Sequence, residues 1–92
     1  NYMEKKSGKP SKELSVADCK KFAETTATFK WHGERTDAGS FPLGCNIYRY
    51  PGYEKNWGVY YYKAKRRPKN LPCGTAHTSC VEKNNVKLSR NL

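Results

Sequence analysis

Apolar residues recur at three- and four-residue steps after position 14, at Val16, Cys19, Phe22 and Ala23. That spacing places them on one face of an α-helix. Ser15 can cap the helix, Leu14 can pack on its first turns, and Asp18 stands three residues after the cap, where a carboxylate reaches back to it. The pattern therefore predicts a helix that begins at about Ser15, ends near Thr25 and buries Cys19.

Three later segments alternate between apolar and polar residues, as half-buried strands do. The first is residues 26–31, and Gly33 prevents it from continuing. The other two are residues 45–50 and residues 57–63. In the third segment Trp57, Val59 and Tyr61 share one face, and Tyr60 and Tyr62 share the other. The expected fold class is α+β, with one N-terminal helix joined by a disulfide to a small three-stranded antiparallel sheet.

The two ends of the chain lack this periodicity. Residues 1–13 are polar and basic, which predicts an extended arm without a core of its own. Residues 65–92 are a basic C-terminal extension that contains a loop closed by Cys73 and Cys80. The expected organisation is therefore an arm (1–13), an α+β module (14–64) and an extension (65–92).

The four cysteines can supply the stability that so few hydrophobic residues do not provide. Only 36% of the 92 residues are hydrophobic, so burial alone leaves the fold marginal. An even number of cysteines in a short chain predicts disulfides and an oxidising compartment, either extracellular or an organelle lumen. Four cysteines allow three pairings, of which we favour Cys19 with Cys45 and Cys73 with Cys80. No apolar run is long enough to span a membrane.

A zinc site is the alternative use of the cysteines. Cys73, His77 and Cys80 are closely spaced, and His32 or another cysteine would complete four ligands. No Cys-x2-Cys pair is present, and the spacing fits no familiar zinc pattern. We therefore expect neither a metal nor a cofactor.

The net charge of +10 is concentrated late in the chain, because residues 61–92 hold eight basic residues and one acidic residue. Such a field attracts acidic protein surfaces, nucleic acid or anionic membranes. A solvated basic surface that only aids solubility is the simpler explanation. We expect the partner-binding residues to be five cations and the two tyrosines of the second sheet face: Lys63, Lys65, Arg66, Arg67, Lys69, Tyr60 and Tyr62.

Two histidines raise the possibility of ribonuclease-type chemistry. His32 and His77 are potential acid and base groups, with Glu24 or Glu34 as a further base and Arg66 or Arg67 for phosphate charge. No spacing forces the two histidines together, and the sequence has none of the common nucleotide-binding or hydrolase motifs. We therefore expect no catalytic residues.

An early cysteine, Cys19, is followed by the motif Phe-Pro-Leu-Gly-Cys-Asn-Ile-Tyr at 41–48 and by Val-Tyr-Tyr at 59–61. In these residues the chain resembles small secreted modules of algal and algal-virus proteins. The resemblance covers about half the chain and implies a Cys19–Cys45 bridge and a non-enzymatic accessory or binding role. The basic residues after Ala64 and the 73–80 loop lie outside it.

These observations together favour a non-enzymatic accessory or structural subunit, or a binding module, that docks through its basic arms and an aromatic sheet face into a larger assembly in an oxidising compartment. The lumenal side of an algal photosynthetic membrane complex, a virion and an extracellular matrix all fit this description. The expected partner is an acidic protein surface. The alternatives are a secreted nucleic-acid-binding protein or ribonuclease, and a cationic antimicrobial protein or toxin that acts on anionic membranes.

Overall fold

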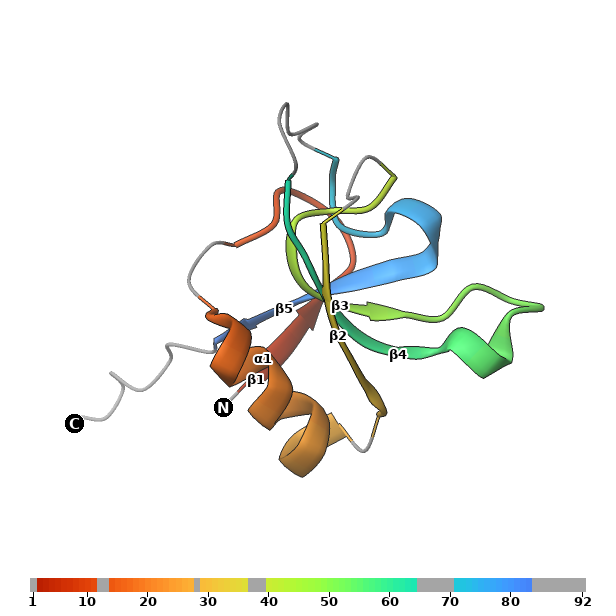
Figure 1. Cartoon of the computed structure of the whole chain (residues 1–92). Coiled ribbons are helices and arrows are strands. Elements are labelled where there is room, and N and C mark those ends of the chain that lie inside the picture. Colours follow the sequence, from red (N-terminus) through yellow and green to blue (C-terminus); the bar gives the residue numbers. More distant parts are fainter. Residues whose placement is uncertain (1, 12–13, 28, 37–39, 65–70, 84–92) are drawn as a thin grey trace.

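The computed structural model describes residues 2–11, 14–27, 29–36, 40–64 and 71–83. They form a small α+β fold, in which one helix packs on a five-stranded mixed sheet with the order β1-β5-β3-β4-β2 (Figure 1). The elements are β1 (Tyr2–Lys5), α1 (Val16–Phe22), β2 (Trp31–Arg35), β3 (Gly44–Tyr48), β4 (Gly58–Tyr62) and β5 (Thr78–Lys83).

The helix begins where the sequence predicts. Ser15 is the N-cap, and its side-chain oxygen accepts a hydrogen bond of 3.1 Å from the backbone N–H of Asp18. After Phe22 the chain continues as a π-helical turn, Ala23–Ala27. The Thr25 hydroxyl donates to the Lys21 carbonyl at 2.6 Å, so this threonine is accommodated in helical backbone.

The sheet differs from the three antiparallel strands that we expected. The segment 26–31 is not a strand as a whole, because the π-helical turn extends to Ala27 and β2 begins only at Trp31. Gly33 does not end β2 but lies inside it, with φ at 95° and a register shift beside it. β2 pairs with β4 in parallel, and this pairing makes the sheet mixed.

The N-terminal segment is also not a free arm. Residues 2–5 form β1, which pairs antiparallel with β5, a strand that continues from the expected 73–80 loop. Lys5 forms an ion pair with Glu82 (3.4 Å), and Glu4 forms one with Arg49 (3.1 Å). The sequence concealed this strand because only Tyr2 of its four residues packs on the core, so no apolar alternation marks it.

Two disulfides crosslink these elements. Cys19 of α1 bonds to Cys45 of β3, and Cys73 bonds to Cys80 of β5, which is the pairing favoured from the sequence. The first joins the helix to the sheet. Two disulfides in a small domain indicate an oxidising compartment. None of the helices in the described ranges is both long and apolar enough to span a membrane.

The main core lies between α1 and the sheet. Its buried members come from the helix and from the sheet face that the helix covers, and they are Leu14, Cys19, Phe22, Ala23, Cys45, Ile47, Val59 and Val81. Tyr2, Phe29, Trp31 and Tyr61 pack against this cluster. The opposite face of β3 and β4 is therefore left for a different set of residues.

Candidate functional site

The face of the sheet opposite α1 is a continuous aromatic surface. Alternation along β3 and β4 turns Tyr48, Tyr60 and Tyr62 away from the helix-side core, where they form a second cluster with Phe41 and Leu43. No α-helix covers this face within the described residues. We call it the aromatic face and define it by seven rings: His32, Phe41, Tyr48, Tyr50, Tyr53, Tyr60 and Tyr62.

Stacked rings form the base of the aromatic face. Tyr60 and Tyr62 are parallel, with centroids 5.5 Å apart and an interplanar angle of 6°. His32 stacks on Tyr60 at 4.4 Å, and Phe41 stacks on Tyr62 at 4.6 Å. Only 8% of Tyr60 and 3% of Tyr62 is exposed. These two predicted contact residues therefore support the face from below and offer a partner little area of their own.

The parallel pairing of β2 with β4 positions the polar side of the aromatic face. Gly33 lies opposite Tyr60 in the ladder, so the neighbouring His32 ring reaches Tyr60. The Arg35 guanidinium lies 5.2 Å from the Tyr60 ring centroid, a cation–π arrangement. His32 also contacts the Trp57 carbonyl through Nε2 at 3.1 Å. Arg35 was not among the partner-binding residues expected from the sequence.

A buried asparagine holds Phe41 in place. Asn46 on β3 is fully buried, and its amide donates to the carbonyls of Pro42 (3.1 Å) and Gly44 (3.2 Å). These bonds fix the turn that precedes β3, and so they keep Phe41 over Tyr62 and beside Tyr48. Phe41 was part of the quoted 41–48 motif, but its stacking depends on a turn that the sequence does not specify.

The aromatic face opens to solvent at one end. Tyr50 is 39% exposed and Tyr53 is 55% exposed, and their rings meet edge-on at 5.5 Å. His77 contacts Tyr50 at 4.6 Å and comes from the loop that the Cys73–Cys80 disulfide closes. Ala76 and His77 both have positive φ, at 55° and 59°, a conformation uncommon outside glycine. The disulfide therefore holds this rim in a backbone shape that such residues rarely adopt.

Two adjacent hollows lie along the aromatic face and share Phe41 and Tyr48 as a common wall. One, of about 270 Å³, is lined by Arg35, Phe41, Tyr48, Asn56, Tyr60 and Tyr62. The other, of about 340 Å³, is lined by Ser40, Phe41, Tyr48, Tyr50, Tyr53 and Ala76. The first hollow therefore has a cationic side chain, Arg35, in its lining. The lining of the second is mainly aromatic.

Two phenols of this face, Tyr60 and Tyr48, ionise less readily than free tyrosine. Burial raises the pKa of Tyr60 above its ordinary value, although the Arg35 guanidinium partly opposes the shift. Burial also raises the pKa of Tyr48, with a further contribution from Tyr53 and Tyr50. The hydroxyls at neutral pH are therefore hydrogen-bond donors, and Tyr60 uses its own to donate to the Asn56 carbonyl at 2.7 Å.

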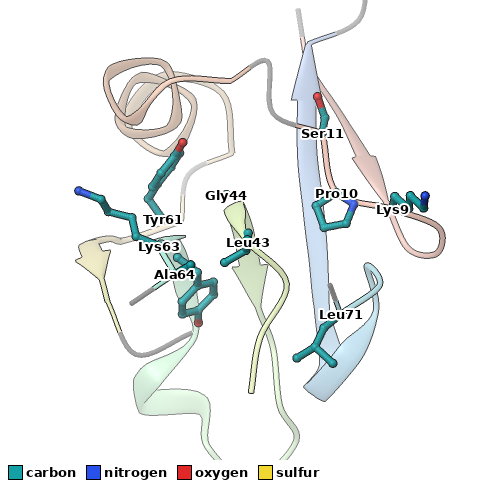
Figure 2. A pocket seen from close by; sticks show the side chains of 10 residues that line it. Lys9, Pro10, Ser11, Leu43, Gly44, Tyr61, Lys63, Ala64 and Leu71 are labelled. Carbon is teal, nitrogen blue, oxygen red and sulfur yellow. The ribbon is translucent and has the colours of Figure 1, made fainter. Parts of the chain in front are cut away.

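A larger cavity of about 540 Å³ lies elsewhere, where β3 begins and β4 ends (Figure 2). Apolar side chains from four separate segments, including Pro10, Leu43, Ala64 and Leu71, line much of it. Figure 2 shows Lys9 and Lys63 on opposite margins, with both ammonium groups turned outward. The cavity is thus chiefly an apolar hollow.

The predicted cationic contacts are only partly described. Lys63 forms an ion pair of 2.9 Å with Glu34, and this carboxylate raises the pKa of Lys63. Lys65, Arg66, Arg67 and Lys69 lie outside the described residues. Of the five predicted cations, Lys63 is therefore the one whose place relative to Tyr60 and Tyr62 the described residues give.

The histidines and cysteines are engaged in separate contacts. His32 stacks on Tyr60, whereas His77 meets Tyr50 at the rim of the face. The Glu34 carboxylate, a candidate base, is paired with Lys63. Cys73 and Cys80 are bonded to each other, so neither thiolate is available as a ligand for the zinc alternative.

The chain was compared with protein-family models, with curated proteins and with solved structures, and none of the three comparisons finds a match.

Proposed function

We propose that this chain is a non-enzymatic docking module, a subunit that binds an acidic protein surface of a larger assembly through its aromatic face. The observation that carries the proposal is the unbroken run of ring contacts from Tyr60 through Tyr48 and Tyr50 to Tyr53. No α-helix of the described part of the chain covers this run.

The exposed end of the run has the composition of a protein interface. Tyrosine and arginine are enriched among the residues that contribute most to protein–protein binding. Tyr50 and Tyr53 offer large, stiff rings that lose little conformational entropy when a partner immobilises them. Arg35 adds a charged group beside buried rings. These three residues are the anchors that the proposal requires.

Charge decides the kind of partner. Four carboxylates of the described residues, Glu4, Asp18, Glu34 and Glu82, are already held in ion pairs with the chain's own cations. Arg35 and several lysines have no such carboxylate partner among the described residues. The remaining field is positive, which speeds encounter with an acidic surface and disfavours basic partners.

The two disulfides support docking by fixing the binding surface in advance. One ties β3, which carries Tyr48, to α1, and the other closes the loop that contributes His77 and Ala76 to the rim. A preorganised surface loses less entropy on binding. An algal membrane complex with a lumenal side, a virion or an extracellular matrix would each supply the oxidising setting that the disulfides indicate.

The test compares three affinity-tagged forms: the native sequence, the double variant Tyr50→Ala/Tyr53→Ala, and Met3→Ala as a matched control. Met3 is similarly exposed, at 46%, but lies on β1, which β5 separates from the strands that carry the aromatic face. Proteins that co-purify from native source material are quantified by mass spectrometry, and the strongest is then purified for direct titration. We expect an acidic protein that the native and Met3→Ala forms bind and the double variant loses.

Equal binding by all three forms in the direct titration would overturn the proposal. A labelled single-stranded RNA and an anionic vesicle serve as competing probes. If the RNA binds with a steep salt dependence and the double variant loses that binding, the surface is a nucleic-acid site instead. If the chain makes the vesicles leak, the membrane-active alternative replaces docking.

A further inference from the structure

Resting on the proposed function, we infer that the aromatic face recognises one kind of partner segment: an extended, proline-rich stretch that carries a carboxylate beside its prolines. The two adjacent hollows along the aromatic face, with Arg35 in one of them, carry this inference. It goes further than docking, because it specifies the backbone conformation and the charge pattern of the segment.

The shape of the hollows suits proline rings. The Phe41 and Tyr48 rings meet at 84°, and the Tyr50 and Tyr53 rings meet at 89°, so each pair forms a corner of two perpendicular aromatic surfaces. Recognition of polyproline II segments uses shallow, aromatic-lined grooves. A pyrrolidine ring is compact, apolar and already fixed in φ, so it packs against such a corner with little further loss of freedom.

The two hollows adjoin each other along the face. The Tyr48 ring of the shared wall lies 5.9 Å from the Tyr60 ring of the first hollow and 6.3 Å from the Tyr50 ring of the second. A polyproline II segment is extended and advances about 3 Å per residue. Two prolines of one such segment can therefore occupy the two hollows with the shared wall between them.

The hydrogen-bonding groups of the face also fit. A proline-rich segment has few N–H donors, and its carbonyls are fully available as acceptors. The phenol hydroxyls of Tyr48, Tyr50 and Tyr53 donate to no other described residue, and a tyrosine hydroxyl can donate a hydrogen bond to a carbonyl. The face thus offers donors where the segment offers acceptors.

Arg35 sets the charge of the segment. It is exposed, lines the smaller hollow and lies over the Tyr60 ring, and it forms no ion pair with a described carboxylate. A planar guanidinium binds a carboxylate through two parallel hydrogen bonds. A Glu or Asp about one turn from the prolines would complete this pair, whereas a Lys or Arg at the same place would be repelled.

The test uses three synthetic twelve-residue peptides and nuclear magnetic resonance titration of the folded, oxidised chain. The first peptide carries Pro-Pro-x repeats with glutamates, the second replaces its prolines with alanine at unchanged charge, and the third replaces its glutamates with glutamine. We expect the first to shift the amides of Tyr48, Tyr50 and Tyr53 and to leave those of α1 unmoved. The alanine peptide should bind at least about tenfold more weakly.

Variants separate ring recognition from charge recognition. Tyr53→Ala should weaken the first peptide about tenfold, as the loss of an interface aromatic typically does. Arg35→Gln should weaken the glutamate peptide about tenfold but leave the glutamine peptide unchanged, so that the preference between the two disappears. Lys20→Gln, which removes an exposed cation from α1, is the matched control and should change neither affinity.

The inference is overturned if the proline and alanine peptides bind equally, if neither shifts the aromatic face at millimolar concentration, or if Arg35→Gln leaves the preference for glutamate intact. The proposed function is judged separately by partner loss in Tyr50→Ala/Tyr53→Ala. If that double variant loses its partner while the peptides fail, the docking role stands and only the proline-rich segment is wrong.

Discussion

The Cys19–Cys45 disulfide should stabilise the fold more than the Cys73–Cys80 disulfide does. We consider the paired variants Cys19→Ala/Cys45→Ala and Cys73→Ala/Cys80→Ala. All four cysteines are almost fully buried, between 0% and 4% exposed, so the loss of packed sulfur is similar in the two variants. The difference between them therefore reports mainly how much each crosslink restricts the unfolded chain.

Loop length gives the expected size of that difference. The bridged residues are 26 positions apart in the first pair and 7 in the second. Loop-closure entropy then gives about 3.5 kcal/mol for the first bridge and about 2.4 kcal/mol for the second, near 25 °C. A chain of 92 residues has a total free energy of unfolding of about 5 to 14 kcal/mol, so either loss is a large fraction.

Urea unfolding followed by the fluorescence of Trp31 and Trp57 measures both variants. With a slope of about 1 to 3 kcal/mol per molar urea, Cys19→Ala/Cys45→Ala should unfold at a midpoint lower by roughly 0.4 to 1 M than the other variant. The reasoning is refuted if Cys73→Ala/Cys80→Ala is the less stable. That result would mean that the second bridge acts through the native state, for instance through the Cys73 N–H, which donates to the Gly8 carbonyl at 2.8 Å.

Three further outcomes follow from particular contacts. Gly58→Ala should lower the free energy of unfolding by about 1 to 3 kcal/mol in a thermal unfolding experiment, because a Cβ at Gly58 would collide with the His32 ring. The displaced ring should also lose its stacking on Tyr60, and the chemical shifts of the two rings should report this loss. Lys83→Met should raise the pKa of the Asp18 carboxyl toward 3.8 in a carbon-13 titration, since the hydrogen bond to Lys83 lowers it in the native chain. In the native chain the stabilisation from Asp18 is present above about pH 3.8 and is lost as the pH falls through the lowered pKa. An unchanged Asp18 pKa in Lys83→Met would contradict this reasoning. Because the Tyr60 pKa is raised above 10.0, the unfolded state releases its proton first, and the free energy of unfolding should decline as the pH rises beyond about 10. Phenolate absorbance that shows every tyrosine ionising together would contradict it.

Short-range sequence patterns predicted those parts of the fold that depend on neighbouring residues. The Ser15 cap follows from residues within one turn, and the alternation along β4 correctly separates Val59 from Tyr60. β1 could not be found in this way, because its pairing with β5 and the packing of Tyr2 on the core join Tyr2–Lys5 to residues far along the chain. β2 begins later in the sequence than predicted, because helical backbone continues through Thr25, although β-branched residues usually favour strands.

Of the aromatic face, the sequence predicted only the tyrosines of β4 that form its base. Tyrosines on the second face of β4 were expected, but their burial was not, because Phe41 and His32 cover them from segments whose positions depend on tertiary structure. Arg35 reaches Tyr60 only because β2 is parallel to β4. No alternation or charge pattern in the sequence encodes which strands become neighbours. The exposed Tyr50 and Tyr53 belong to a turn, where periodicity gives no direction.

The pairing of β1 with β5 affects how this protein can be made. During synthesis residues 2–5 emerge from the ribosome before their hydrogen-bonding strand, residues 78–83, which follows some seventy residues later. Until then β1 has no neighbour in the sheet, and β3 also lacks the partner on its β5 side. Contacts this distant in sequence slow folding and leave strand edges exposed to other chains. Nascent chains truncated before Thr78 should therefore be the species that chaperones retain and that aggregate most readily.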